Sequence, residues 1–189
     1  MAKTVKMIQK NIGALIIILF CAFSCSKEEK SEPVEEQTFE IGQEYGGGLI
    51  FYIDNSGKHG LIAYYFNPGR VPWGCEGDGY IGADQFDIGG GLQNTQAICN
   101  GCSESGIAAR LCSDMVFGSY DDWYLPSVEE LRKMYINLHL QGKGNFNNRY
   151  YWSSTEHSSG YAYRISFGNG FQYYLSKSSE IDYRPIRAF

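Results

Sequence analysis

The chain has 189 residues, of which 43% are hydrophobic, 15% aromatic and 20% charged, and its formal net charge is −5. This length suits a leader followed by one domain with a hydrophobic core of its own. The acidic balance excludes a wholly basic surface, so we expect no nucleic-acid partner. The charge is uneven, because residues 127–189 contain 8 basic and 5 acidic residues. That part of the chain can offer a positive face to an anionic ligand.

The N-terminus has the pattern of a bacterial signal peptide over residues 1–24. Three lysines within the first ten residues precede an apolar run at 12–23. This run is shorter than the roughly 20 residues that a membrane-spanning helix needs. Residues 22–24 resemble a lipobox, which implies cleavage and lipidation at Cys25, and the following Ser-Lys-Glu-Glu resembles the export signal of Bacteroidetes-type surface lipoproteins. We therefore expect a lipid-anchored protein of the outer membrane, exposed on the cell surface.

Residues 25–44 have the composition of a flexible tether. They are acidic, contain Pro33 and include few apolar side chains, so they cannot bury enough surface to fold by themselves. Loss of the leader removes three lysines and no acid, which brings the net charge to about −8. The folded domain is expected over residues 45–189.

Four cysteines follow the predicted anchor: Cys75, Cys99, Cys102 and Cys112. An even number in an exported protein predicts two disulfides, and four cysteines allow three pairings. We favour Cys75 with Cys102 and Cys99 with Cys112, because a bridge between Cys99 and Cys102 would close a very tight loop. The same Cys-x-x-Cys spacing is also that of a zinc half-site, but no second pair of ligands lies at a suitable distance in the sequence. No metal is expected there.

The periodicity of the chain predicts an α+β domain with a mainly antiparallel sheet and two principal helices. Short apolar runs separated by turn residues predict a hairpin, and Asn169–Gly170 predicts the turn of a second one. A helical turn is expected at 94–99 and a helix capped by Ser105 at 107–115, with the second principal helix after Ser127. The expected strands are residues 49–54, 60–66, 150–155, 161–167, 171–177 and 183–189.

The acidic stretch around residues 121–131 is interpreted as scaffold. Ser127 and Glu130 have the spacing of a capping box, in which each side chain bonds the backbone N–H of the other residue. Asp121 and Asp122 precede it and offer carboxylate oxygens to calcium, but two adjacent acids without a wider ligand pattern indicate a calcium site only weakly. We therefore expect no cofactor, with calcium as a minor alternative.

A set of motifs in a fixed order carries a resemblance to a known family. These motifs are GGGLIFYIDNSGKHGLIA, WGC, NTQAI, AARLC, DWYLPSVEEL, YWSSTE and RPIRAF. Over residues 45–189 the chain resembles the Lcl C-terminal domain family of bacterial surface proteins. The resemblance implies a fold related to C-type-lectin-like domains and to formylglycine-generating enzymes. In one member of that family, a collagen-like adhesin, the domain is associated with the binding of sulfated glycosaminoglycans.

The residues do not assemble a catalytic pattern. Formylglycine-generating enzymes use a late cysteine pair, whereas this chain has no cysteine after Cys112. Ser153 or Ser154 could pair with His157, but no acid or oxyanion motif accompanies them. Glycoside hydrolysis needs a pair of carboxylates, and the sequence does not indicate which acid would be the partner of Glu156. We expect a protein that is not an enzyme.

Aromatic and basic residues gather near the C-terminus and predict a binding surface. Aromatic rings pack on the C–H faces of sugars, and guanidinium groups donate to hydroxyls, carboxylates or sulfates. The expected ligand is an extracellular glycan, or a matrix or host protein. The alternatives are a structural component of the envelope that binds a partner protein and, with less support, a polysaccharide-active enzyme. The candidate ligand-binding residues are Tyr151, Trp152, Glu156, Tyr161, Tyr163, Arg164, Tyr173, Tyr174 and Lys177.

Overall fold

The computed structural model describes residues 37–189. The predicted signal peptide, the lipidation site Cys25 and the tether as far as residue 36 lie outside the described residues. None of the described helices combines the length and the apolar character needed to cross a membrane. Residues 37–189 belong to one compact unit by their contacts, and this unit contains two hydrophobic clusters.

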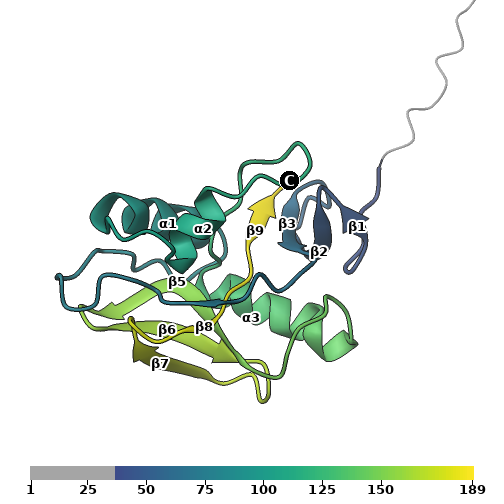
Figure 1. The fold of residues 1–189 in the computed structure, drawn as a ribbon. Coiled ribbons are helices and arrows are strands. Elements are labelled where there is room, and N and C mark those ends of the chain that lie inside the picture. The colour runs from purple at the N-terminus through teal and green to yellow at the C-terminus, as the bar shows by residue number, and fades with distance from the viewer. Residues whose placement is uncertain (1–36) are drawn as a thin grey trace, which may run out of the picture. The chain divides into compact units, whose positions relative to one another are not determined.

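Two sheets form the frame of the domain (Figure 1). The first sheet is antiparallel, with the strand order β1-β2-β3-β9. Its strands are β1 (Glu44–Tyr45), β2 (Gly48–Ile53), β3 (Gly60–Tyr64) and β9 (Ile186–Ala188). The second sheet has the order β4-β8-β5-β6-β7, and only the β5–β8 pair is parallel. Its strands are β4 (Arg70–Val71), β5 (Tyr150–Ser158), β6 (Tyr161–Ser166), β7 (Gln172–Ser176) and β8 (Ile181–Asp182).

Three α-helices cover the two faces of the second sheet. They are α1 (Gly90–Gly101), α2 (Ala108–Ser113) and α3 (Val128–Asn137), and a short 3-10 helix, η1 (His139–Gln141), follows α3. Trp152 of β5 packs in one cluster with α1 and α2, whereas the adjacent Tyr151 packs in the other cluster with α3. Since successive side chains of a strand point to opposite faces, the sheet lies between these two helical layers.

The predicted α+β class is confirmed, and so are the capping box and both hairpins, but residues 37–189 form two sheets and three α-helices instead of one sheet and two principal helices. Asp54–His59 join β2 to β3, and the loop between β6 and β7 contains Gly170 at a φ of 76°. Two helix details were wrong. The predicted turn at 94–99 is part of the 12-residue helix α1, and Ser105 does not cap α2, whose N-cap is Ile107 without a side-chain bond.

The capping box at the start of α3 also holds the start of α1. Glu130 Oε2 accepts from the backbone N–H of Ser127 at 2.8 Å, and its Oε1 accepts from Gly89 N at 2.9 Å. A Cβ on Gly91 would lie 2.2 Å from Glu130 Oε2, so only glycine allows this approach. Burial raises the pKa of the Glu130 carboxyl, and the backbone N–H donors act against that rise. The acidic stretch is therefore scaffold, as predicted.

Residues 37–44 contact the domain although they fall within the predicted tether. The Phe39 ring lies 4.9 Å from the Tyr45 ring and 4.7 Å from the Phe189 ring, both edge to face. Gly42 N donates to Ile50 O at 2.7 Å. The acidic composition of this stretch did not indicate these contacts. One aromatic ring and a few backbone hydrogen bonds are enough to order so short a stretch.

The disulfide between Cys75 and Cys102 is confirmed, whereas the predicted bridge between Cys99 and Cys112 is wrong. Cys112 of α2 is fully buried in the hydrophobic cluster, and Cys99 of α1 packs at the border of the same cluster. Apolar packing of the two helices positions these side chains without a bond between them. Burial raises the pKa of both thiols.

We predict that alkylation of native residues 37–189 modifies Cys99 alone, and that unfolding exposes Cys112 as a second thiol. Mass spectrometry after digestion would count the modified sites. Replacement of Cys75 and Cys102 by alanine should lower the free energy of unfolding by about 3 to 4 kcal/mol, because the bridge spans 27 residues. Cys99→Ser is the control and should leave stability nearly unchanged. A native protein without any reactive thiol would show that the second bridge exists.

Candidate ligand-binding site

Four of the predicted ligand-binding residues belong to the interior. Tyr151 and Trp152 are fully buried and point into the two different hydrophobic clusters. Glu156 and Lys177 form an ion pair whose side chains are both inaccessible to solvent. These four residues cannot contact a ligand at the surface, so their prediction as ligand contacts was wrong. Their aromatic or charged character reflects packing and internal pairing.

The ion pair joins three parts of the chain. Lys177 Nζ lies 2.6 Å from Glu156 Oε1 and 4.5 Å from the centre of the Trp73 ring. Glu156 Oε2 accepts from Ile81 N at 2.9 Å and from Gly82 N at 2.8 Å. The carboxylate thereby ties the loop that carries the disulfide to strand β5 and to the end of β7. Buried charges need this degree of pairing, since each would otherwise lose its solvation.

The other five candidates are divided between the two faces of the second sheet. Tyr161, Tyr163 and Tyr174 lie on the face that α3 partly covers, where the His157 ring stacks on Tyr174 at 4.2 Å. Tyr163 is half-buried and packs against Phe86 at 5.0 Å. Arg164 and Tyr173 are directly paired across β6 and β7 on the opposite face. The predicted patch is therefore not one surface, because neighbouring residues of a strand point in opposite directions.

Arg164 stacks on one tyrosine ring and lies beside a second, in a group that we call the tyrosine–arginine cluster (Tyr150, Arg164 and Tyr173). Its guanidinium carbon is 3.8 Å from the centre of the Tyr150 ring and 5.9 Å from that of Tyr173. Its Nε is buried without a hydrogen-bond partner among the described residues. Burial lowers the pKa of this guanidinium. The cluster thus holds a cation against aromatic faces without a carboxylate to neutralise it.

A cavity of about 260 Å³ adjoins this cluster and shares Tyr150 with it. It is lined by Arg70, Asn148, Arg149, Tyr150, Ile181 and Asp182. The side chain of Arg70 donates to Glu180 O at 2.6 Å, and Asp182 Oδ1 accepts from Asn67 at 3.0 Å. Two arginines against one carboxylate leave the lining positive. The cavity and the cluster together form a site suited to an anionic ligand with an apolar face.

Four site residues were not among the predicted ligand-binding residues: Arg70, Asn148, Arg149 and Tyr150. Arg70 reaches the site because β4 pairs with β8, which places it opposite Asp182, more than a hundred residues later in the chain. No local pattern could have indicated this pairing. Arg149 and Tyr150 carried a weak signal, since they stand at the start of the aromatic and basic stretch.

The other polar candidates have structural partners. Both oxygens of the Asp122 carboxylate accept from Arg187, at 2.6 and 2.8 Å, and these bonds hold its pKa below the ordinary value. Ser153 Oγ donates to Tyr163 O, and Ser154 Oγ accepts from Asn94. The two serines are fully buried and neither is bonded to His157. The structure therefore does not assemble the serine–histidine pair considered from the sequence.

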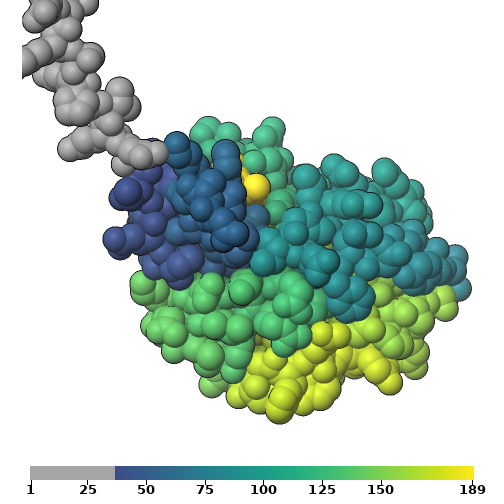
Figure 2. All heavy atoms as spheres, turned by 180° about the vertical axis from the view of Figure 1, so that it is seen from behind, coloured from purple at the N-terminus to yellow at the C-terminus, as the bar shows by residue number. Residues whose placement is uncertain are grey.

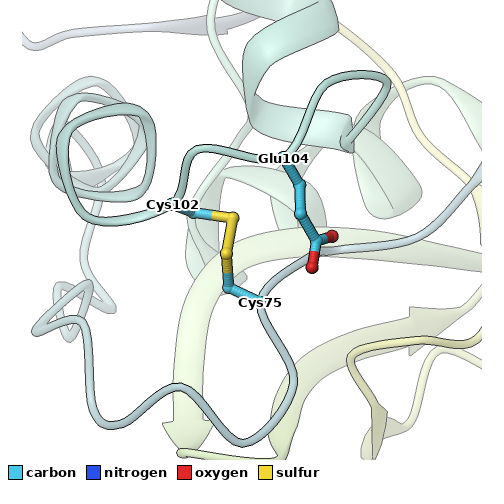
Figure 3. Close-up of side chains that lie close together, drawn as sticks. All are labelled: Cys75, Cys102 and Glu104. Atoms are coloured by element: carbon cyan, nitrogen blue, oxygen red, sulfur yellow. A yellow bond between two sulfur atoms is a disulfide. The ribbon is translucent and has the colours of Figure 1, made fainter.

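Among residues 37–189, one group of three potential metal ligands comes together: Cys75, Cys102 and Glu104. Figure 3 shows the bond between the two sulfurs, with the Glu104 carboxylate beside them. Because metal ligation by cysteine requires thiolates, this group does not fit a metal while the disulfide is intact.

Comparisons with known proteins place most of the domain in a family. The model of the Lcl C-terminal domain matches residues 67–187. Among solved structures, a fimbrial protein from Bacteroides ovatus is similar, with 15% sequence identity and a TM-score of 0.48. The match covers 68% of this chain and 35% of that protein, so it spans about a third of the fimbrial protein's length. A search of curated proteins finds no match.

We predict that Lys177→Met lowers the free energy of unfolding by about 3 to 5 kcal/mol, since it leaves the Glu156 carboxylate buried without its cation. Urea denaturation followed by fluorescence would measure this loss. The double variant Glu156→Gln with Lys177→Met should recover part of it, because no uncompensated charge remains. If Lys177→Met had no effect on stability, the pair would not hold the loop, β5 and β7 together.

Proposed function

The chain belongs to the Lcl C-terminal domain family, and we propose that it is a non-catalytic binding domain whose ligand is an acidic extracellular glycan. In this proposal the mature protein is a lipoprotein of the outer membrane, anchored through Cys25 and displayed on the cell surface. The acidic stretch after Cys25 separates the lipid from the domain. The C-type-lectin-like arrangement expected from the family resemblance is part of the same proposal.

The observation that carries this proposal is the environment of Arg164. The guanidinium stacks on the Tyr150 ring with the Tyr173 ring nearby, and no carboxylate or carbonyl among the described residues accepts a hydrogen bond from it. Although Nε is buried, Arg164 as a whole is only half-buried, so the terminal N–H groups of its guanidinium are the ones that can donate to a carboxylate or a sulfate of a ligand. Arg70 and Arg149 line the cavity on the other side of Tyr150 and extend the positive surface.

The aromatic members of the site suit the apolar faces of sugar rings. Tyr150 and Tyr173 are each more than a third exposed, and their rings meet edge to face at 5.8 Å. The packing of Arg164 on Tyr150 restrains both side chains before a ligand arrives, which lowers the entropy lost on binding. Asn148 adds an exposed amide that can bond ring hydroxyls. This combination of cations, aromatic faces and an amide supports recognition of a sugar chain that carries acidic groups and hydroxyls.

A glycan array probed with residues 37–189 at physiological salt would identify the ligand, and it should include sulfated and uronic-acid polymers. We expect selective binding to acidic glycans without release of product. Titration calorimetry with the best oligosaccharide should then show that Arg164→Gln weakens binding by about 10- to 100-fold, the value of a charge-assisted hydrogen bond of 1.5 to 3 kcal/mol.

Tyr161→Ala is the matched control for this experiment, because Tyr161 is exposed on the opposite face of the same sheet. We expect it to bind like the wild type, and both variants should keep the wild-type melting temperature. Loss of binding in Tyr161→Ala with full binding in Arg164→Gln would move the site to the other face. An array without bound glycan would refute the proposed function, and cleavage of the glycan would replace it with an enzyme.

A further inference from the structure

Strand β7 is an open edge of the second sheet. The strand order places β6 on one side of it and no strand on the other (Figure 1). In the view from behind, the C-terminal part of the chain (yellow-green to yellow) forms the lower border of the domain (Figure 2). The edge strands β1, β4 and β9 have only two or three residues, whereas β7 has five. Among the described residues, β7 is thus the longest strand available for pairing with another chain.

The register of the β6–β7 pair determines which backbone groups face outward. Ser166 N donates to Phe171 O at one end of the pair, and Lys177 N donates to Gly160 O at the other. Hydrogen-bonded and non-hydrogen-bonded pairs alternate in an antiparallel ladder, so Tyr173 and Leu175 bond to β6. The backbone N–H groups of Gln172, Tyr174 and Ser176 therefore point away from β6. Within the described part of the chain, none of these three N–H groups donates to a backbone acceptor outside the β6–β7 ladder.

The side chains of this edge lack the features that usually prevent pairing. Native edge strands are protected by charged residues, proline, bulges or covering segments. The sequence of β7 is Gln-Tyr-Tyr-Leu-Ser, without charge or proline, and its register with β6 has no bulge. Tyr174, at the centre of the strand, is 54% exposed. An uncharged, regular and exposed edge favours the addition of a further strand.

We propose that β7 pairs antiparallel with β7 of a second copy of this chain, around a two-fold axis at Tyr174. Tyr174 of each copy then exchanges two backbone hydrogen bonds with the other Tyr174. Gln172 of one copy lies opposite Ser176 of its partner, and the Ser176 N–H donates to the Gln172 carbonyl, whereas the Ser176 carbonyl accepts from Ser179 N of its own chain. In this arrangement residue 174 pairs with residue 174, and residue 172 pairs with residue 176, so the same surface of each copy forms the interface. A symmetric dimer requires this self-complementarity. The two sheets become one continuous sheet.

Charged side chains beside the edge favour a second copy over an unrelated strand. Arg132 donates to the side chain of Gln172 at 3.1 Å, and Ser176 donates to the Glu76 carboxylate at 2.9 Å. Gln172 and Ser176 are on the same face of the sheet, since they are four residues apart in a strand. Pairing Gln172 with Ser176 of the partner therefore brings Arg132 near the partner's Glu76. The two-fold axis repeats this attraction, so the edge is complementary to itself.

Sedimentation velocity of residues 37–189 over a range of concentrations tests the proposal. The wild type should show a reversible monomer–dimer equilibrium. Tyr174→Lys places two like charges at the two-fold axis, as does Tyr174→Glu, so each variant alone should have a dimer dissociation constant raised at least tenfold. An equimolar mixture of the two variants should restore a heterodimer, because opposite charges then meet across the axis. Recovery in the mixture separates loss of pairing from loss of folding.

Tyr80→Lys is the control, because it adds the same charge at a tyrosine that is 57% exposed in a loop. It should dimerise like the wild type. A wild-type chain that remains monomeric up to about 1 mM would overturn the proposal. A trimer would also overturn it, and so would a dimer that forms in Tyr174→Lys by itself or in Tyr174→Glu by itself. Each of these results would place the contact elsewhere. Dimer formation can be tested without any ligand, whereas glycan binding is tested with the variants Arg164→Gln and Tyr161→Ala. The two proposals can therefore fail independently.

Discussion

The alternation of side chains along β5 and β6 is the constraint on which the rest of this structure depends. Tyr151 and Trp152 are adjacent, yet they fill two different hydrophobic clusters, so the second sheet is packed on both faces. Once these two rings are buried, the register determines the direction of each neighbour. Arg164 lies opposite Trp152 and extends beyond its cluster, where it contacts Tyr150. The candidate binding surface is therefore a consequence of how the core is filled.

The buried pair of Glu156 and Lys177 adds a polar anchor to this apolar frame. Apolar packing tolerates small shifts in position, whereas a buried carboxylate bonded to one ammonium and two backbone N–H groups requires one geometry. Because Lys177 directly follows β7, this geometry holds the edge strand against the body of the domain. Both the tyrosine–arginine cluster and the open edge depend on β7 staying in register.

The sequence predicted those features that depend on neighbouring residues. Ser127 and Glu130 are three residues apart, and the hairpin turns are equally local, so their chemistry could be recognised directly. Burial and long-range pairing could not be inferred. Tyr151 and Tyr150 have the same side chain, and only the register decides that one is core and the other surface. Arg70 joins the site through a strand pair far away in the sequence, and Cys99 and Cys112 are placed by helix packing.

Ligand binding and pairing through β7 reinforce each other if both occur. A two-fold axis perpendicular to the joined sheet keeps equivalent residues on the same face, so two tyrosine–arginine clusters would point in one direction. A glycan polymer could then contact both copies, and the second contact would be intramolecular. The lipid anchors that we propose at the N-termini would add further local concentration at a membrane. Weak single sites would be sufficient for firm attachment in this arrangement.

The most direct measurement is an NMR titration of isotopically labelled residues 37–189 with a short acidic oligosaccharide. We expect the largest chemical-shift changes at Tyr150, Arg164 and Tyr173, together with Arg70 and Arg149 in the adjoining cavity. Changes confined to His157, Tyr161 and Tyr174 on the opposite face would contradict this expectation, as would a spectrum that the oligosaccharide leaves unchanged.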